Sequence, residues 1–104
     1  MSRKAKLEQM LRDSDSDPFL HFDLAMELLK EGRQDEALAS FDRVTALDAN
    51  YLAAYLQKGH ALAAMCRADD ARAALTTGIA AARRSGDLHA AEEMISVLQA
   101  FSGE

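Results

Sequence analysis

The sequence predicts an all-α fold built from helix-turn-helix repeats, on three observations. A shift of 34 residues aligns the chain with itself, placing Leu28 on Leu62, Arg33 on Arg67, Asp35 on Asp69 and Ala37 on Ala71. Apolar residues recur at helical spacing along nearly the whole chain, and no alternating strand pattern competes. The only proline, Pro18, stands where a helix N-terminus tolerates it. Each repeat of such a solenoid buries its apolar face only by stacking on its neighbours.

The composition indicates one globular domain over residues 1–104. Hydrophobic residues make up 49% of the chain, and a domain of this size buries roughly two thirds of its unfolded surface. The single cysteine, Cys66, cannot form an internal disulfide. We therefore expect one core that needs no cofactor and no metal.

The net charge of -5 argues against two classes of partner. It opposes phosphate backbones and anionic membranes, and no basic run compensates locally, so neither nucleic acid nor a membrane is expected. No segment approaches the ~20 apolar residues of a membrane span. The basic N-terminus lacks the apolar stretch of a secretory signal, which makes the cytoplasm the expected compartment.

About six helices are expected, beginning with an amphipathic helix over residues 3–12. The first repeat, residues 18–50, holds a helix from Pro18 to Glu31, with Asp17 as its N-cap, and a helix from Gln34 to Leu47. Gly32 ends the first of these as a left-handed cap.

The second repeat, residues 52–84, repeats this arrangement. Its helices are expected from Leu52 to Met65 and from Asp69 to Arg84. Gly86 and Asp87 then predict a C-cap followed by an N-cap, so that residues 87–101 form a terminal capping helix. Atypical end helices are what a short solenoid needs for solubility.

These repeats resemble the tetratricopeptide repeat family. Its small-residue positions correspond to Ala25, Ala37, Gly59, Ala71 and Gly78, and its large apolar positions to Leu28, Phe41, Tyr55, Leu62 and Leu75. Small residues are required where two helices pack at ~8–10 Å. The resemblance covers about Pro18 to Arg84 and implies a right-handed α-α superhelix. The chain departs from the family pattern at His21, Val44, Ala49, Lys58 and Cys66.

The resemblance implies a non-enzymatic module that binds a peptide or helix of another protein. The family binds such ligands on the concave face formed by the first helix of each repeat. The residues expected there are Phe19, Phe22, Met26, Leu29, Lys30, Leu56, Gln57 and His60. The lysine, arginine and asparagine clamp with which some members hold a C-terminal carboxylate looks absent, because Phe22, Met26 and Gln57 occupy comparable places.

Two alternatives remain open for this apolar face. The end helices could fold over it, or a second copy of the chain could occupy it and form a homodimer with a structural role. An apolar groove that contains methionine suits an amphipathic helix or a second copy.

The sequence offers little for catalysis or metal binding. The run from Asp13 to Asp17 matches the start of a calcium loop but lacks the following glycine and the twelfth-position glutamate, so it is interpreted as a solvated linker. His89, Glu92 and Glu93 are interpreted as a solvent-facing set, and no catalytic residue is assigned. His60 is expected to be a partly buried hydrogen-bonding side chain or, alternatively, a binding residue.

Overall fold

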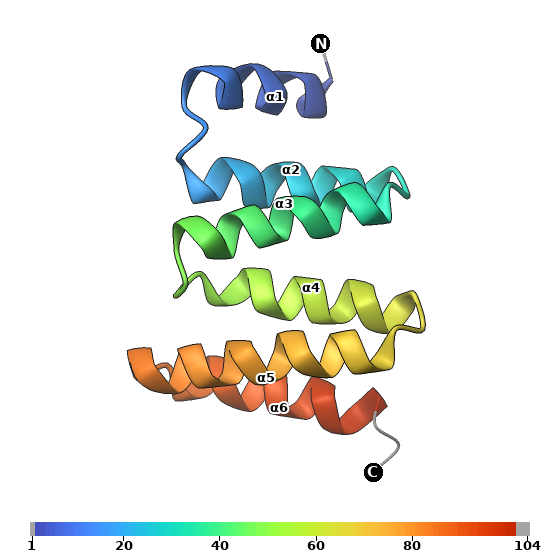
Figure 1. The fold of residues 1–104 in the computed structure, drawn as a ribbon, viewed down its shortest axis with the longest axis vertical. Coiled ribbons are helices and arrows are strands. Elements are labelled where there is room, and N and C mark those ends of the chain that lie inside the picture. The colour runs from blue at the N-terminus through green and yellow to red at the C-terminus, as the bar shows by residue number, and fades with distance from the viewer. Residues whose placement is uncertain (1, 102–104) are drawn as a thin grey trace. The chain divides into compact units, whose positions relative to one another are not determined.

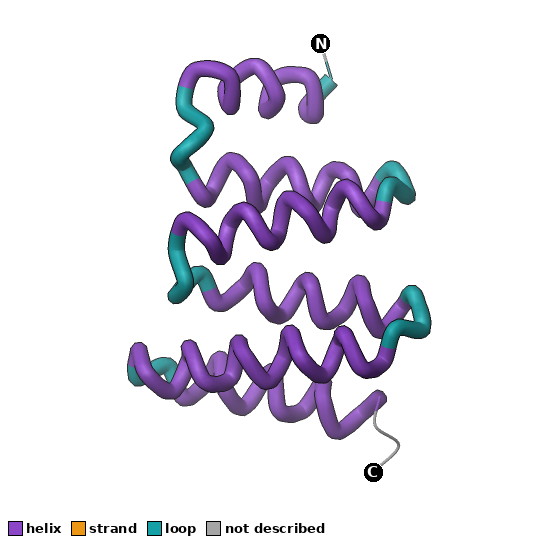
Figure 2. The backbone as a smooth tube through the Cα atoms, in the orientation of Figure 1, coloured by secondary structure: helices purple, strands orange, loops and turns teal. Residues whose placement is uncertain are grey.

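A computed structural model describes residues 2–101, all of them in helices or short connections (Figures 1 and 2). Met1 and residues 102–104, which the predicted domain of residues 1–104 includes, lie outside the described residues. The helices are α1 (Arg3–Asp13), α2 (Pro18–Lys30), α3 (Gln34–Leu47), α4 (Leu52–Ala64), α5 (Ala68–Ser85) and α6 (Leu88–Phe101). The all-α prediction is confirmed, with helix ends that coincide with the expected ones or differ from them by one residue.

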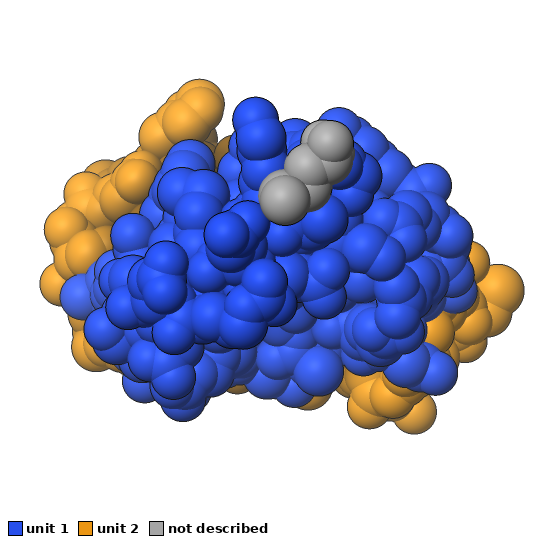
Figure 3. Space-filling model, turned by 90° about the horizontal axis from the view of Figure 1, so that it is seen from above, with its two compact units in different colours: residues 1–51 blue, residues 52–104 orange. Residues whose placement is uncertain are grey.

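Backbone contacts divide the chain into two compact units, coloured separately in Figure 3. Unit 1 is Met1–Tyr51 and contains α1, α2 and α3. Unit 2 is Leu52–Glu104 and contains α4, α5 and α6. The division falls at the boundary that the sequence predicts between the two repeats, so each unit contains one repeat and one end helix.

In unit 1 the core lies between α2 and α3. Helix α2 packs against α3, and the buried side chains are Ala25 and Leu28 on α2 and Ala37, Phe41 and Val44 on α3. Since these positions follow the i, i+3, i+4, i+7 spacing, each helix buries one face. A smaller cluster of Leu7, Leu11 and Leu20 attaches α1 to α2.

In unit 2 helix α5 packs against both α4 and α6. The buried cluster combines Tyr55 of α4 with Leu75 and Ile79 of α5 and with Ala91 and Met94 of α6. Alanine and glycine occupy many of the contact positions of α5, which lets its neighbours approach closely.

Three helices end on the same hydrogen-bonded turn. After α2, Gly32 donates to the Leu29 carbonyl at 3.0 Å and Arg33 donates to the Leu28 carbonyl at 2.9 Å. The same pair of bonds follows α4 and α5, with Cys66 and Gly86 in the place of Gly32. All three residues have left-handed φ values, of 76°, 60° and 79° for Gly32, Cys66 and Gly86. The predicted caps at Gly32 and Gly86 are therefore confirmed.

Side chains cap the helix N-termini as the sequence predicts. A carboxylate oxygen of Asp17 accepts a hydrogen bond from Phe19 N at 2.9 Å, and Asp87 accepts one from Ala90 N at 3.0 Å. The α3 and α5 helices begin instead with a repeated ion pair, in which Arg33 binds Glu36 and Arg67 binds Asp70, each at 2.7 Å. Acidic residues in these first turns also suit the positive end of the helix dipole.

Candidate functional site

The α2 residues that are predicted for the concave face differ in their exposure to solvent. Phe19 is 57% exposed and Lys30 is exposed, whereas Phe22, Met26 and Leu29 are partly buried. Phe22 contacts Phe41 edge to face, with ring centroids 5.8 Å apart, and lies 5.2 Å from the ring of Tyr51. Phe22 therefore stabilises unit 1, whereas the ring of Phe19 is largely exposed.

Carboxylates surround the ring pair formed by Phe22 and Tyr51. Burial raises the pKa of the Tyr51 hydroxyl above its usual value, and the negative charges of Asp17, Asp23 and Asp48 raise it further. This part of unit 1 is thus both aromatic and acidic.

Helix α1 packs along another part of the α2 surface. Its contacts run along Leu20 and Leu24 and through ion pairs of Arg3 with Asp23 and of Lys4 with Glu31. Asp23 also lies near Tyr51, so the contacts of α1 reach the edge of the stripe that runs from Phe19 to Leu29. Within unit 1, Phe19 and Lys30 of this stripe remain exposed.

In α4 the predicted residues are placed at different depths. Leu56 and Gln57 are partly buried, and Leu56 packs against the Tyr55–Met94 cluster. His60 is exposed, which differs from the expectation that it is partly buried. The reason is that successive helix residues point about 100° apart, so His60 points away from the buried side of α4 that its neighbour Gly59 occupies.

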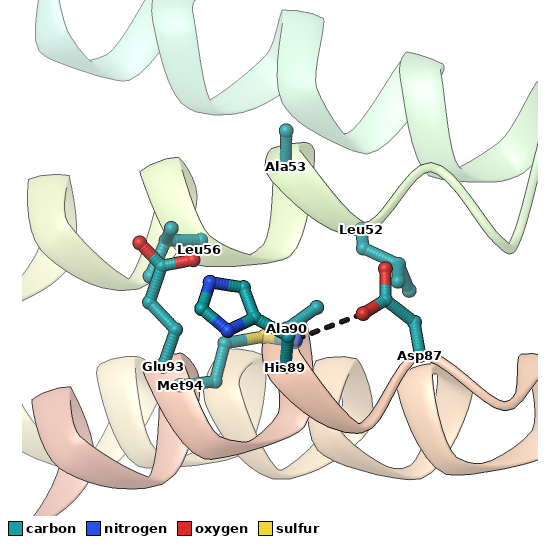
Figure 4. A pocket seen from close by; sticks show the side chains of 8 residues that line it. All are labelled: Leu52, Ala53, Leu56, Asp87, His89, Ala90, Glu93 and Met94. Carbon is teal, nitrogen blue, oxygen red and sulfur yellow. Dashed lines mark hydrogen bonds between the residues drawn. The ribbon is translucent and has the colours of Figure 1, made fainter.

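A hollow of about 270 Å³ lies between α4 and α6 within unit 2 (Figure 4). Leu52, Ala53 and Leu56 line it from α4, and the other lining residues are Asp87, just before α6, and His89, Ala90, Glu93 and Met94 of α6. In Figure 4 His89 and Glu93 extend from α6 toward α4. Met94 is 1% exposed and forms the floor, whereas His89 and Glu93 are exposed.

The sequence predicts Leu56 as a site residue but does not predict the α6 residues that line the hollow with it. It assigns Glu93 and His89 to a solvent-facing set of a capping helix, because their spacing on one helix contains no information about a second helix. The only available signal is that Ala90 and Met94 are apolar, with His89 and Glu93 directly beside them.

The described residues contain no group of three or more His, Cys, Asp or Glu side chains that could hold a metal ion. Around the aspartate run, the Asp17 carboxylate caps α2 and the His21 ring lies 2.7 Å from the Asp15 carbonyl oxygen. Cys66 is an exposed free thiol in a turn. No helix among the described residues is long and apolar enough to cross a membrane.

The described residues thus form a helical repeat structure with an apolar hollow between α4 and α6. The family model for the tetratricopeptide repeat matches residues 28–95, which is more than half of the chain. The chain therefore belongs to the tetratricopeptide repeat family.

Solved structures agree with this assignment. A tetratricopeptide repeat domain protein from Salinibacter ruber shares 31% identity, covering 84% of this chain and 88% of that chain, with a TM-score of 0.79. The TPR2B domain of yeast Sti1, in its complex with pHsp70, shares 20% identity over 96% of this chain and 80% of that chain, with a TM-score of 0.88. PcrH, in complex with the chaperone binding region of PopD, shares 15% identity over 96% and 76% of the two chains, with a TM-score of 0.86. A search of curated proteins finds no match.

Proposed function

We propose that this chain is a non-enzymatic protein–protein interaction module. In this proposal a peptide or helix of a partner protein binds the concave face of the first helices of the repeats. The residues are those predicted from the sequence: Phe19, Phe22, Met26, Leu29, Lys30, Leu56, Gln57 and His60. Nucleic acid and membranes are not among the proposed partners, since the net charge is -5.

The observation that carries the proposal is apolar surface left uncovered on these helices. Phe19 is 57% exposed, and Leu52 and Leu56 are only partly buried where they line the hollow. Contiguous exposed apolar surface marks protein interaction sites, and aromatic residues are enriched among the residues that contribute most to binding. The Sti1 and PcrH complexes support a protein ligand, because both contain this fold with a segment of another protein.

A homodimer through the same face is the second candidate function. Its support is the exposure of Phe19 on that face, at 57%. A second copy would cover such side chains as well as a partner would. Light scattering coupled to size-exclusion chromatography decides between a monomer near 11.3 kDa and a stable dimer.

The proposal is tested by selecting a binding peptide from a random linear library and titrating it into the labelled chain, followed by NMR. We expect amide shifts to concentrate in α2 and α4. Phe19→Asp should weaken the selected peptide at least about tenfold, the size of a hot-spot loss. Ala39→Asp is the matched control, since it adds the same charge at an exposed position of α3 in the same unit.

Three results would count against the proposal. Shifts confined to α3 and α5 would place binding elsewhere, and equal effects of the two aspartates would remove the role of Phe19. A wild-type dimer that Phe19→Asp dissociates would make self-association the function.

A further inference from the structure

The hollow between α4 and α6 has apolar walls and an acidic rim. Leu52 and Leu56 form one wall, Ala90 lies opposite, and Met94 closes the floor. Leu52, Leu56 and Ala90 are partly buried, so they remain accessible to a ligand. Burying them further under an apolar side chain of a ligand would therefore be favourable.

Two carboxylates and no Lys or Arg line this hollow. Asp87 is held in place because one of its oxygens caps α6 through Ala90 N. Glu93 is exposed and has no ion-pair partner among the residues that the structure describes. A cationic group beside an apolar anchor would therefore meet a free carboxylate in Glu93 and a fixed one in Asp87.

The hollow has a volume of about 270 Å³, near the lower end of the ~300–1,000 Å³ that is typical of small-molecule sites. That volume suits one large apolar side chain. The acidic rim beside it favours a partner segment that presents such a side chain next to a positive charge.

We infer that the hollow binds an apolar anchor residue of a partner peptide that carries lysine or arginine next to that anchor. This inference rests on the proposed function and specifies the chemistry of its partner. Glu93 supplies the attraction at the rim, and Leu52, Leu56 and Met94 supply the apolar contact. The same carboxylates disfavour acidic segments.

The test uses three synthetic amphipathic peptides with identical leucine positions, flanked by lysine, by glutamine or by glutamate. Each is titrated against the full chain by fluorescence anisotropy at low and high salt. We expect the lysine peptide to bind at least about tenfold more tightly than the glutamate peptide, with a difference that salt reduces.

Glu93→Lys and Glu92→Lys form a matched pair. Both sites are exposed on α6 and both substitutions change the net charge equally, but only Glu93 lines the hollow. Glu93→Lys should weaken the lysine peptide about fivefold, because reversing the sign doubles a rim interaction, and Glu92→Lys less than about twofold. Leu56→Ala should weaken all three peptides, with a thermal melt to confirm that the variant is folded.

The outcomes separate this inference from the proposed function. If the glutamate peptide binds as tightly as the lysine peptide, or if the two lysine substitutions act equally, the inferred chemistry is wrong and the interaction module remains. If Leu56→Ala, once shown to be folded, changes no affinity, the hollow is not the anchor site. If no library peptide binds at all, the proposed function itself fails.

Discussion

The two units form the same helical hairpin with side chains of different size. A shift of 34 residues pairs Ala25 with Gly59, Phe41 with Leu75 and Val44 with Gly78. Unit 1 fills its helix interface with Phe41 and Val44, both fully buried. Unit 2 instead has glycine at the position of Val44. A Cβ added at Gly78 would lie 2.5 Å from Tyr55 Cβ and 2.6 Å from the sulfur of Met94, so no side chain fits there.

The difference shows how one position determines another. The residue that aligns with Tyr55 in unit 1 is His21, which is only partly buried and points to the Asp15 carbonyl. Because His21 inserts no large side chain into the helix interface of unit 1, that interface has room for Val44. In unit 2 the ring of Tyr55 is buried and requires glycine opposite it.

The largest effect is expected from Phe41→Ala. Phe41 is fully buried and contacts Phe22, so its truncation should destabilise the protein by about 3–5 kcal/mol. Leu75→Ala at the equivalent position of unit 2 removes a smaller side chain and should cost less, about 2–4 kcal/mol. Urea unfolding measures both. A larger loss for Leu75→Ala would contradict the view that unit 1 depends on volume at this position.

Gly78→Val places the residue of unit 1 into unit 2. The new side chain would overlap Tyr55 and Met94, and we expect a loss of about 3 kcal/mol from overpacking. Ala80→Val, at an exposed position of the same helix, should lose only about 0.5 kcal/mol through helix propensity. Equal midpoints in urea for the two variants would show that α5 does not approach its neighbours closely.

Substitutions at the two equivalent turns should change the stability of the protein in opposite directions. Cys66 has the left-handed φ of Gly32 but carries a side chain, so Cys66→Gly should stabilise the chain by about 0.5 kcal/mol after the entropy gained by the unfolded state is subtracted. Gly32→Ala should destabilise it by about 1 kcal/mol, although a Cβ there meets nothing within 4 Å. Thermal melts of both variants check this prediction, and the same sign for both would refute it.

The smallest effect concerns the ionisation of Tyr51 in unit 1. Burial and three aspartates raise its pKa in the folded state above the ordinary 10.0. The corresponding stability is present below about pH 10 and is lost as pH rises through the folded pKa. Stability should therefore fall less in Tyr51→Phe than in the wild type between about pH 8 and pH 11. Identical declines in urea unfolding would contradict the assigned surroundings of Tyr51.

Much of the fold follows from local sequence. The 34-residue period, the apolar spacing and the caps at Asp17, Gly32, Gly86 and Asp87 predict six helices, because each signal acts within one or two turns of chain. The departure at Cys66 is also visible in the sequence as a missing turn glycine, and the structure gives its consequence, a left-handed cysteine.

The candidate site is less predictable, because it depends on pairs of helices. Helical periodicity assigns Phe19 and Phe22 to one face but cannot show that Phe22 packs on Tyr51 while Phe19 stays exposed. It likewise assigns Glu93 to solvent, since the hollow exists only once α4 and α6 lie side by side. Contacts between helices such as these become visible only in the tertiary structure.

The central claim is that apolar surface of this chain, including the hollow lined by α4 and α6, binds a segment of another protein. The most direct measurement is an NMR titration of the labelled wild-type chain with the lysine-flanked amphipathic peptide. We predict saturable amide shifts centred on Leu56, Ala90 and Glu93, which Glu93→Lys weakens and Glu92→Lys preserves. Shifts that do not saturate, or that centre on the outer face of α5, would contradict the account.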